Sequence, residues 1–433
     1  MGRSLTHWVY GMMREPGGDM LMIDGNAYKR PAAAGLCCKR AGGFKIKISI
    51  LYLLIFVLLI TGCAENTSKE AEEPVSGSIL EGQIRSDLRS AAQELEFIRQ
   101  KAESVYKNEK GYWEARFVHD ITMIYIPEGT FIMGNDRLHE KVSGSPAAPQ
   151  HPVTLTAYWI AKTPVTKGQF RIFVEEENYT TSVETPGHEG PWVYDFAEKG
   201  FVTIPGFHWD NAFSQVTAKF PHVKIDDSHP VTCVSWYDAA DFCKWLSRKT
   251  GANFVLPTEA QWEYAARGND ERIYPWGNED PDGTRANYAD EAFNAVFPGT
   301  EQAKVHFGIN DGYAATSPVG SFPLGASPCG ALDMAGNVTE WVFDWYGDYQ
   351  KKHYENPIGP KEGKDRVMKA GFWAGSAGRE GKDPDELIIG HNIRADARQY
   401  DDPDSADDHL GFRIAIDYVS RTCVSDNAAK RNK

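Results

Sequence analysis

The sequence predicts an α+β fold in which a few short helices and small antiparallel sheets are joined by many loops. Three observations support this class. From Ile121 onward, glycine, proline and tryptophan interrupt apolar runs that are too short for long helices. Some of these runs alternate between apolar and polar residues, as half-buried strands do, and others follow helix-capping residues. Beyond Gly268 irregular segments dominate, and no internal repeat is visible.

Three segments of this region have the alternation that is typical of strands. Met123–Gly134 contains a Pro-Glu-Gly turn, which predicts a hairpin, and His151–Lys162 predicts another strand. Near the end of the chain, Leu410, Phe412 and Ile414 alternate and are expected to face the core from a closing strand.

Capping residues predict three helices. Ser235 is expected to begin one helix and Gly251 to end it, because glycine readily adopts the left-handed conformation of a C-cap. Residues 181–228 carry few clear signals and are interpreted as an insertion rich in aromatic residues. The other two helices begin with capping boxes, formed by Thr166 with Gln169 and by Thr258 with Gln261.

The N-terminal residues 1–62 are predicted to be a leader that ends in a bacterial lipoprotein signal. Ile48–Ile60 is an uncharged apolar run, too short to span a bilayer comfortably and about as long as the core of a signal peptide. Basic residues precede it, and the sequence Ile-Thr-Gly-Cys that follows places Cys63 where a lipid would be attached. A short membrane anchor with a chance cysteine is the alternative.

Four further segments are expected along the chain. Residues 63–78 are polar and acidic, which is typical of a flexible tether. Residues 79–110 carry an apolar stripe at helical spacing and predict an amphipathic helix, which either pairs with a partner helix or packs on its own domain. The folded domain is expected at 121–418, and a polar C-terminal tail follows at 419–433.

Charge and cysteine content exclude some classes of function. The formal net charge is −14, so the surface should repel nucleic acid, which is not expected as a partner. No CxxC pair or histidine cluster predicts a zinc site. After Cys63 the chain carries four cysteines that could form up to two disulfides of unknown pairing: Cys233, Cys243, Cys329 and Cys423.

An acidic run near the C-terminus has five aspartates within eight residues, Asp401–Asp408. The EF-hand pattern, with glycine at its sixth position and glutamate at its twelfth, does not fit it. A core strand follows directly, so a disordered tail does not fit either. We interpret these aspartates as solvated residues of a fixed loop, with Arg394 and Arg398 forming exposed ion pairs across it.

Several phrases together resemble the formylglycine-generating enzyme (sulfatase-modifying factor) family. They occur in the family's order from Met123 to Ile416, about two thirds of the chain, and the ordered set is highly specific. The resemblance implies an elaborated C-type-lectin-like fold with small antiparallel sheets. The phrases are IPEGTFIMG, HPVTCVSWYDAADFCKW, LPTEAQWEYAARG, YPWGN, TSPVGSFP, GALDMAGNVTEWVFDWY, RVMKAG and LGFRIAI.

The resemblance implies two structural calcium sites, since members of the family with known sites use oxygen ligands at matching positions. In both sets side chains and backbone carbonyls contribute oxygen. The first set is Asn287, Tyr288, Asp311 and Tyr313, and the second is Asp333, Gly336, Val338 and Glu340.

Copper is not expected. The family's oxidases hold Cu(I) between two cysteines, and soft thiolates are what cuprous copper prefers. The first matching position falls near Ala374–Gly375, and the second falls in a lengthened segment, but no cysteine occurs between Cys329 and Cys423. A family disulfide from Cys243 is also missing, because its partner position is Ile414.

The resemblance therefore favours a lipid-anchored protein of the bacterial cell envelope that binds a protein or surface ligand. Similar lipoproteins serve as assembly components, and similar variable proteins vary in the segment that matches 372–409. Ala64 after the lipid cysteine favours the outer membrane by analogy. The expected contact face is Phe372, Trp373, Arg379, His391, Asn392, Arg394, Tyr400 and Asp402.

An enzyme without copper is the alternative. His391 and His409 bracket the variable segment beside aspartates, so they could hold iron or zinc. Relatives that make sulfoxides carry iron on a His-rich motif in a separate helical domain, and no HxxxHxE motif occurs in this chain.

Overall fold

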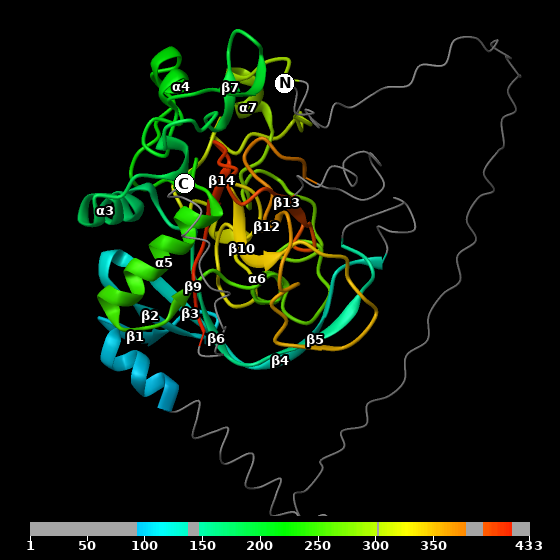
Figure 1. Cartoon of the computed structure of the whole chain (residues 1–433). Helices are drawn as coiled ribbons and strands as arrows, with labels where there is room; N and C mark the ends of the chain where they lie inside the picture. The colour runs from blue at the N-terminus through cyan, green and yellow to red at the C-terminus, as the bar shows by residue number, and fades with distance from the viewer. Residues whose placement is uncertain (1–92, 137–146, 301–302, 378–392, 418–433) are drawn as a thin grey trace, which may run out of the picture. The chain divides into compact units, whose positions relative to one another are not determined.

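A six-stranded antiparallel sheet lies at one end of the folded domain (Figure 1). The computed structural model describes residues 93–136, 147–300, 303–377 and 393–417, all within one compact unit, Val75–Lys433. In spatial order the strands are β1 (Ser104–Lys107), β2 (Trp113–Arg116), β3 (Thr122–Ile126), β6 (Tyr158–Ala161), β15 (Ala415–Ile416) and β9 (Phe254–Val255).

The other strands of the described residues form three smaller sheets. The α+β class with small sheets is confirmed, although β10 pairs with β14, and β11 with β5, in parallel. The four-stranded sheet has the order β13 (Gln399–Asp401), β12 (Arg366–Lys369), β10 (Thr339–Trp345) and β14 (Leu410–Phe412). The others are β11 (Tyr354–Glu355), β5 (His151–Leu155) and β4 (Gly129–Met133), and the pair β7 (Trp192–Asp195) and β8 (Gly200–Thr203).

The three helices predicted from capping residues begin where expected. The Thr166 hydroxyl accepts a hydrogen bond from Gln169 N at 3.1 Å, and Thr258 accepts one from Gln261 N at the same distance. Ser235 caps a helix that ends at Gly251 in the left-handed conformation. From residue 104 onward the described helices are α3 (Lys167–Glu177), α4 (Ser214–Lys219), α5 (Trp236–Thr250), α6 (Glu259–Arg267) and α7 (Glu291–Val296), with short 3₁₀ turns at Val118–Asp120, Ser182–Glu184 and Pro323–Gly325.

The predicted hairpin at Met123–Gly134 is wrong. Strand β3 pairs with β2 and β6, whereas β4 pairs with β5 in another sheet. The turn between β3 and β4 therefore carries the chain from one sheet to the next. Gly129 is required there, because a Cβ at this position would lie 2.1 Å from the Tyr264 hydroxyl.

The predicted helix over 79–110 is wrong in its last part. Residues 93–101 are helical, but Ser104–Lys107 forms β1 and pairs with β2. The helix packs on its own domain through the buried Ile98, while Val105 reaches the same core from the strand. A stripe with helical spacing can thus continue across a turn into a strand, where a β-branched residue packs well.

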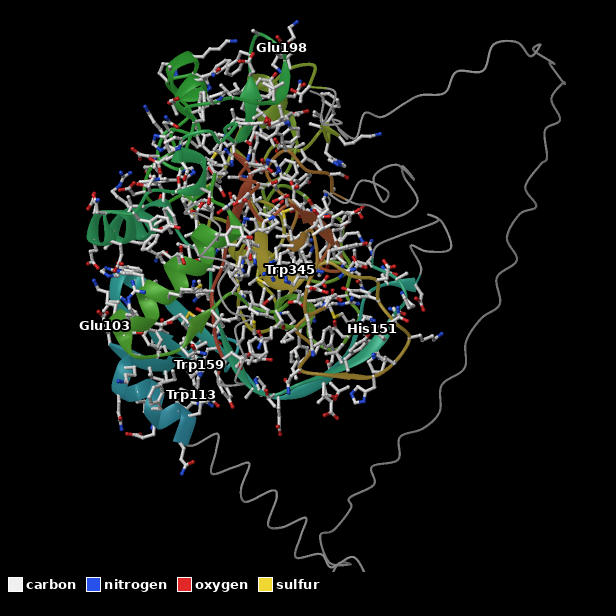
Figure 2. The ribbon with its side chains drawn as sticks, in the orientation of Figure 1. Glu103, Trp113, His151, Trp159, Glu198 and Trp345 are labelled. Atoms are coloured by element: carbon white, nitrogen blue, oxygen red, sulfur yellow. The ribbon has the colours of Figure 1, made fainter. Side chains whose placement is uncertain are left out.

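The leader, the tether and the C-terminal tail lie outside the described residues, as does Cys63. Within the described ranges, every helix is too short or too polar to cross a bilayer. The predicted closing strand is confirmed in its packing, since Leu410, Phe412 and Ile414 are fully buried in one core. Trp159 of β6 is fully buried in the same core, where its ring packs against that of Tyr125 from β3 (Figure 2).

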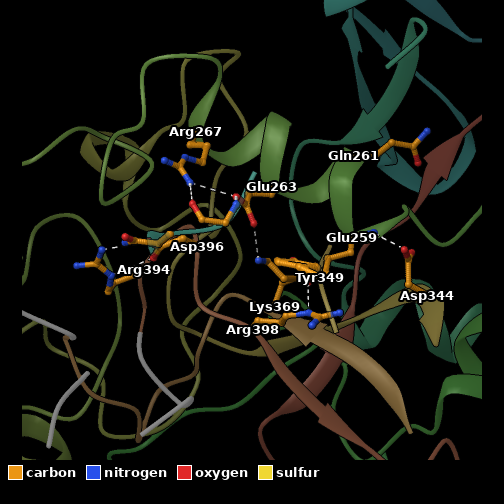
Figure 3. Close-up of polar contacts among 12 residues, drawn as sticks. Glu259, Gln261, Glu263, Arg267, Asp344, Tyr349, Lys369, Arg394, Asp396 and Arg398 are labelled. Carbon is orange, nitrogen blue, oxygen red and sulfur yellow. Dashed lines mark hydrogen bonds and ion pairs between the residues drawn. The ribbon is translucent and has the colours of Figure 1, made fainter. Parts of the chain in front are cut away.

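One face of α6 carries three buried charges at successive helical turns, Glu259, Glu263 and Arg267. Glu263 accepts hydrogen bonds from Lys369 Nζ at 3.0 Å and from Arg267 Nη1 at 3.1 Å (Figure 3). Burial would raise the pKa of the Glu263 carboxyl, but Lys369 and Arg267 outweigh it and hold that pKa below its ordinary value. The helix is thereby fixed to β12.

The arginines at 394 and 398 are buried ion-pair partners, not the exposed pairs that the sequence predicts. Arg398 Nε donates to Glu259 Oε1 at 2.7 Å, so the ion-pair partner of Arg398 lies on α6 and not in the acidic loop. Arg394 Nε donates to Asp396 Oδ1 at 2.9 Å, two residues away (Figure 3). Both arginines are at most 3% exposed, so the segment that carries them is pinned to the core.

Replacing Glu263 should test this fixation. Glu263→Gln leaves Lys369 and Arg267 buried without their carboxylate, which should lower the free energy of unfolding by about 3–5 kcal/mol. Urea denaturation measures it. Arg248→Gln, which removes an exposed pair with Glu177, is the control and should cost at most about 1 kcal/mol. A Glu263→Gln loss no larger than the control's would contradict the role given to this carboxylate.

Candidate functional site

The segment that follows β12 is packed into the core instead of facing solvent. Phe372 is 5% exposed and Trp373 is 1% exposed, so the prediction that they belong to a contact face is wrong. Trp373 Nε1 also donates to the Asp408 carbonyl at 3.3 Å. The Trp373 ring packs among aromatic rings from residues 181–228 and from α7 and its C-cap, namely those of Phe201, Phe213, Phe293 and Phe297.

Of the other residues predicted for that face, the structure brings two to the surface. Tyr400 is 43% exposed and its ring lies 3.9 Å from that of Tyr346, and Asp402 is exposed in the following turn. Arg394 is buried against Asp396, so its predicted contact role is wrong too. Three predicted residues lie outside the described residues: Arg379, His391 and Asn392.

The acidic run is only partly solvated. Asp402 and Asp404 are exposed, but Asp407 and Asp408 are buried, which corrects the prediction of a solvated run. Strand β7, in residues 181–228, contributes to this burial because it is hydrogen-bonded to the acidic loop. Asp408 N donates to the Trp192 carbonyl at 3.1 Å, and Asp408 Oδ2 accepts from Tyr194 N at 3.0 Å. Residues 181–228 carry few clear signals in the sequence, so this cover could not be predicted.

His409 lies between two buried carboxylates. Its Nδ1 is 3.3 Å from Asp408 Oδ1, its Nε2 is 3.8 Å from Asp407 Oδ2, and its ring stacks on Phe372 at 4.1 Å. Burial raises the pKa of Asp407 to about 7, although His409 opposes this shift. Cys233 lies next to the acidic loop, because its backbone N donates to the Asp407 carbonyl at 2.8 Å. Burial, with Asp408 and Asp407 nearby, raises the pKa of this thiol, so it stays protonated.

The first predicted calcium set fits a hard cation. Asn287 is fully buried, and its Nδ2 donates to the Ala315 carbonyl at 2.8 Å, while its Oδ1 has no hydrogen-bond partner in the described structure. Asp311 accepts from Tyr288 N and Tyr313 N, and burial beside Asp290 raises its pKa to about 8. A cation would satisfy the orphaned oxygen and offset the two buried carboxylates.

The second predicted set fits calcium less well, because an arginine already supplies positive charge there. Glu340 accepts from Arg413 Nε at 2.6 Å and from Arg413 Nη2 at 2.7 Å. Arg413 also donates to the Asp333 carbonyl at 3.1 Å, and Gly320 N donates to the Asp333 carboxylate. Burial raises the pKa of Asp333 to about 6. Gly336 and Val338 lie on the connection between Asp333 and Glu340.

The residues at the first predicted copper position carry no sulfur. Ala374 is buried, and the stretch from β12 to Ala377 contains no cysteine. The second position lies outside the described residues. In the part of the chain that the structure describes, Cys233, Cys243 and Cys329 are buried and form no disulfide with one another, and no group of three or more His, Cys, Asp and Glu is arranged to hold a metal ion.

The buried Asp407 should make stability depend on pH. Its folded-state pKa of about 7 exceeds the unfolded value of about 3.9, so the folded state binds more protons between these values and stability falls as pH rises through them. Asp407→Asn removes this loss, so its unfolding free energy relative to wild type should be higher at about pH 8 than at about pH 5. Urea denaturation at both pH values measures it. The exposed Asp404→Asn control should show no such change, and an Asp407→Asn difference independent of pH would contradict the assignment.

Comparison with known proteins agrees with this fold. The family described as "Sulfatase-modifying factor enzyme 1-like domain" matches residues 114–418. The formylglycine-generating enzyme of Bos taurus is 30% identical over 316 residues, which are 69% of this chain and 76% of that protein. The inactive C-alpha-formylglycine-generating enzyme 2 of Mus musculus is 31% identical over 312 residues, which are 68% of this chain and 86% of that protein.

A solved structure shows a more distant likeness. PvdO from Pseudomonas aeruginosa aligns with a TM-score of 0.48 and 23% identity, over 73% of this chain and 99% of that one. The match to the family covers well over half of the chain and includes the helices and strands from β3 to β15. The chain therefore belongs to the sulfatase-modifying factor enzyme 1-like family.

Proposed function

We propose that this chain is a lipid-anchored protein whose sulfatase-modifying-factor-like domain binds a protein or surface ligand and does not carry out copper-dependent oxidation. One observation carries the proposal. The stretch that would hold copper has no thiolate, and its residues Phe372 and Trp373 are buried in aromatic packing. Cuprous copper depends on soft sulfur ligands, so this packing replaces a metal site with core.

Overall similarity does not decide between an active and an inactive domain. The relative named as a formylglycine-generating enzyme is 30% identical to this chain, and the relative named as inactive is 31% identical. The residues of the site, and not overall identity, therefore decide the function.

A recognition role suits the way in which this domain holds its loops. Buried ion pairs at Glu259 and Glu263 fix the segments that lead to β13, where Tyr400 and Asp402 are exposed. Loops fixed on a rigid scaffold are common binding surfaces. Anchoring through Cys63 would place the domain at the outer membrane of the bacterial envelope, and Cys63→Ser should release the protein from the membrane fraction.

Calcium at the first oxygen set should stabilise the domain. We expect calcium to raise the melting temperature and a chelator to lower it, since an ion that binds only the folded state at a hundredfold excess over its Kd adds about 2.7 kcal/mol. Asp311→Asn removes one buried carboxylate of the set and should abolish the response. Asp282→Asn, in an exposed turn, is the control. A melting temperature that a chelator leaves unchanged would contradict a calcium site.

The absence of copper chemistry can be tested with a peptide. A peptide containing Cys-x-Pro-x-Arg, incubated with the protein, Cu(I), a thiol reductant and oxygen, should keep its cysteine, because Ala374 and Gly375 offer no sulfur to the metal. Mass spectrometry detects an aldehyde product, and an active relative serves as positive control. Aldehyde formation at a rate that depends on copper would refute the proposal.

A further inference from the structure

A cavity of about 200 Å³ lies beside the C-terminal end of α6. Ala265 and Gly268 line it from this helix and its C-cap, while Ile126 and Pro328 add apolar groups from other segments. Cavities of roughly 150 Å³ in other proteins hold benzene, so this one has room for a single ring with a small substituent. The cavity shares no residue with the proposed calcium sets or the predicted contact face.

Two tyrosines, Tyr112 and Tyr264, bring hydroxyl groups to the wall of this cavity. Among the described residues neither hydroxyl makes a hydrogen bond to a protein group, and both oxygens keep accessible surface. Burial raises the pKa of both phenols, so both stay protonated and can donate a hydrogen bond at neutral pH. Tyr112 also raises the pKa of Tyr264, which indicates that the two side chains lie near each other.

The surroundings of both tyrosines hold them in place before any ligand enters. Tyr264 packs against Phe131 with 5.1 Å between the ring centroids, and its hydroxyl lies over Gly129, where a Cβ would be only 2.1 Å away. Tyr112 N donates to Asn108 Oδ1 at 3.0 Å, and the Tyr112 carbonyl accepts from Asn108 N at 2.9 Å. A site whose groups are already fixed loses less conformational entropy when it binds a ligand.

The two arginines on the cavity wall are already paired with carboxylates. Arg267 Nη1 donates to Glu263 Oε1 at 3.1 Å, and Arg272 Nε donates to Asp270 Oδ1 at 2.7 Å. An anion that entered the cavity would therefore lose its hydration without gaining an unpaired cation, which is unfavourable. An uncharged molecule with an acceptor oxygen avoids this cost and can still bond to the hydroxyls.

We propose that this cavity binds a small uncharged organic molecule that carries a carbonyl group on a ring, such as an aromatic amide or ketone. The carbonyl oxygen has two lone pairs and accepts hydrogen bonds from the Tyr112 and Tyr264 hydroxyls, while the ring lies against Ile126 and Pro328. The proposal rests neither on the recognition role nor on calcium.

Calorimetry on the full chain with benzamide, toluene and benzoate tests the proposal. We expect one saturable benzamide site and an affinity for toluene, which has the ring but no acceptor, that is at least roughly tenfold lower, as two hydrogen bonds would give. Benzoate should also bind more weakly than benzamide, because its charge finds no free partner. No saturable benzamide binding would overturn the proposal, and so would toluene or benzoate binding as tightly as benzamide.

Tyr112→Phe and Tyr264→Phe each remove one hydroxyl and keep the ring. Each should weaken benzamide binding roughly threefold or more, through loss of one hydrogen bond, and leave toluene affinity unchanged. Because neither hydroxyl bonds to a described protein group, both variants should unfold cooperatively at nearly the wild-type melting temperature.

Tyr354→Phe is the matched control, because Tyr354 packs beside His151 and does not line the cavity. This variant should bind benzamide as wild type does. Wild-type benzamide affinity in either cavity variant, or an equally large loss of toluene affinity there, would overturn the role given to the hydroxyls.

Discussion

The ion pairs of Glu263 with Lys369 and Arg267 are the interaction on which the rest of this structure depends. A domain of short strands and long irregular segments has few backbone ladders to hold it, so its segments must be fixed by other contacts. Helix α6 does this by aligning three charges on one buried face. Breaking such a pair leaves a buried charge uncompensated, so arrangements of the segments that separate these partners are disfavoured.

The site inherits its geometry from this network. Arg398 and Arg394 pair with Glu259 and Asp396, so the segment that leads to β13 and the closing loop has a fixed path. The insertion then covers the loop, and His409 with its two carboxylates is enclosed in an aromatic surrounding. A rigid scaffold remains, and its interior at this point is a packed core in the described residues.

Local signals in the sequence predicted local structure well. The capping boxes at Thr166 and Thr258 appear as predicted, because each depends only on residues three apart. The hairpin after β3 failed because each strand pairs with partners other than its neighbour in sequence: β3 with β2 and β6, and β4 with β5. Exposure was predicted poorly for Trp373, because Phe201 and Phe213, which pack against its ring, come from residues 181–228, a segment with few clear signals in the sequence.

We propose that aromatic core takes the place of a soft-metal site in this domain. A competition titration of the protein with Cu(I) against a colorimetric Cu(I) chelator tests it directly, with X-ray absorption of any bound copper to identify its ligands. The structure predicts no site that outcompetes the chelator, because Ala374, Gly375 and their neighbours up to Ala377 offer no sulfur. One equivalent of tightly bound Cu(I) with two sulfur ligands would contradict the claim.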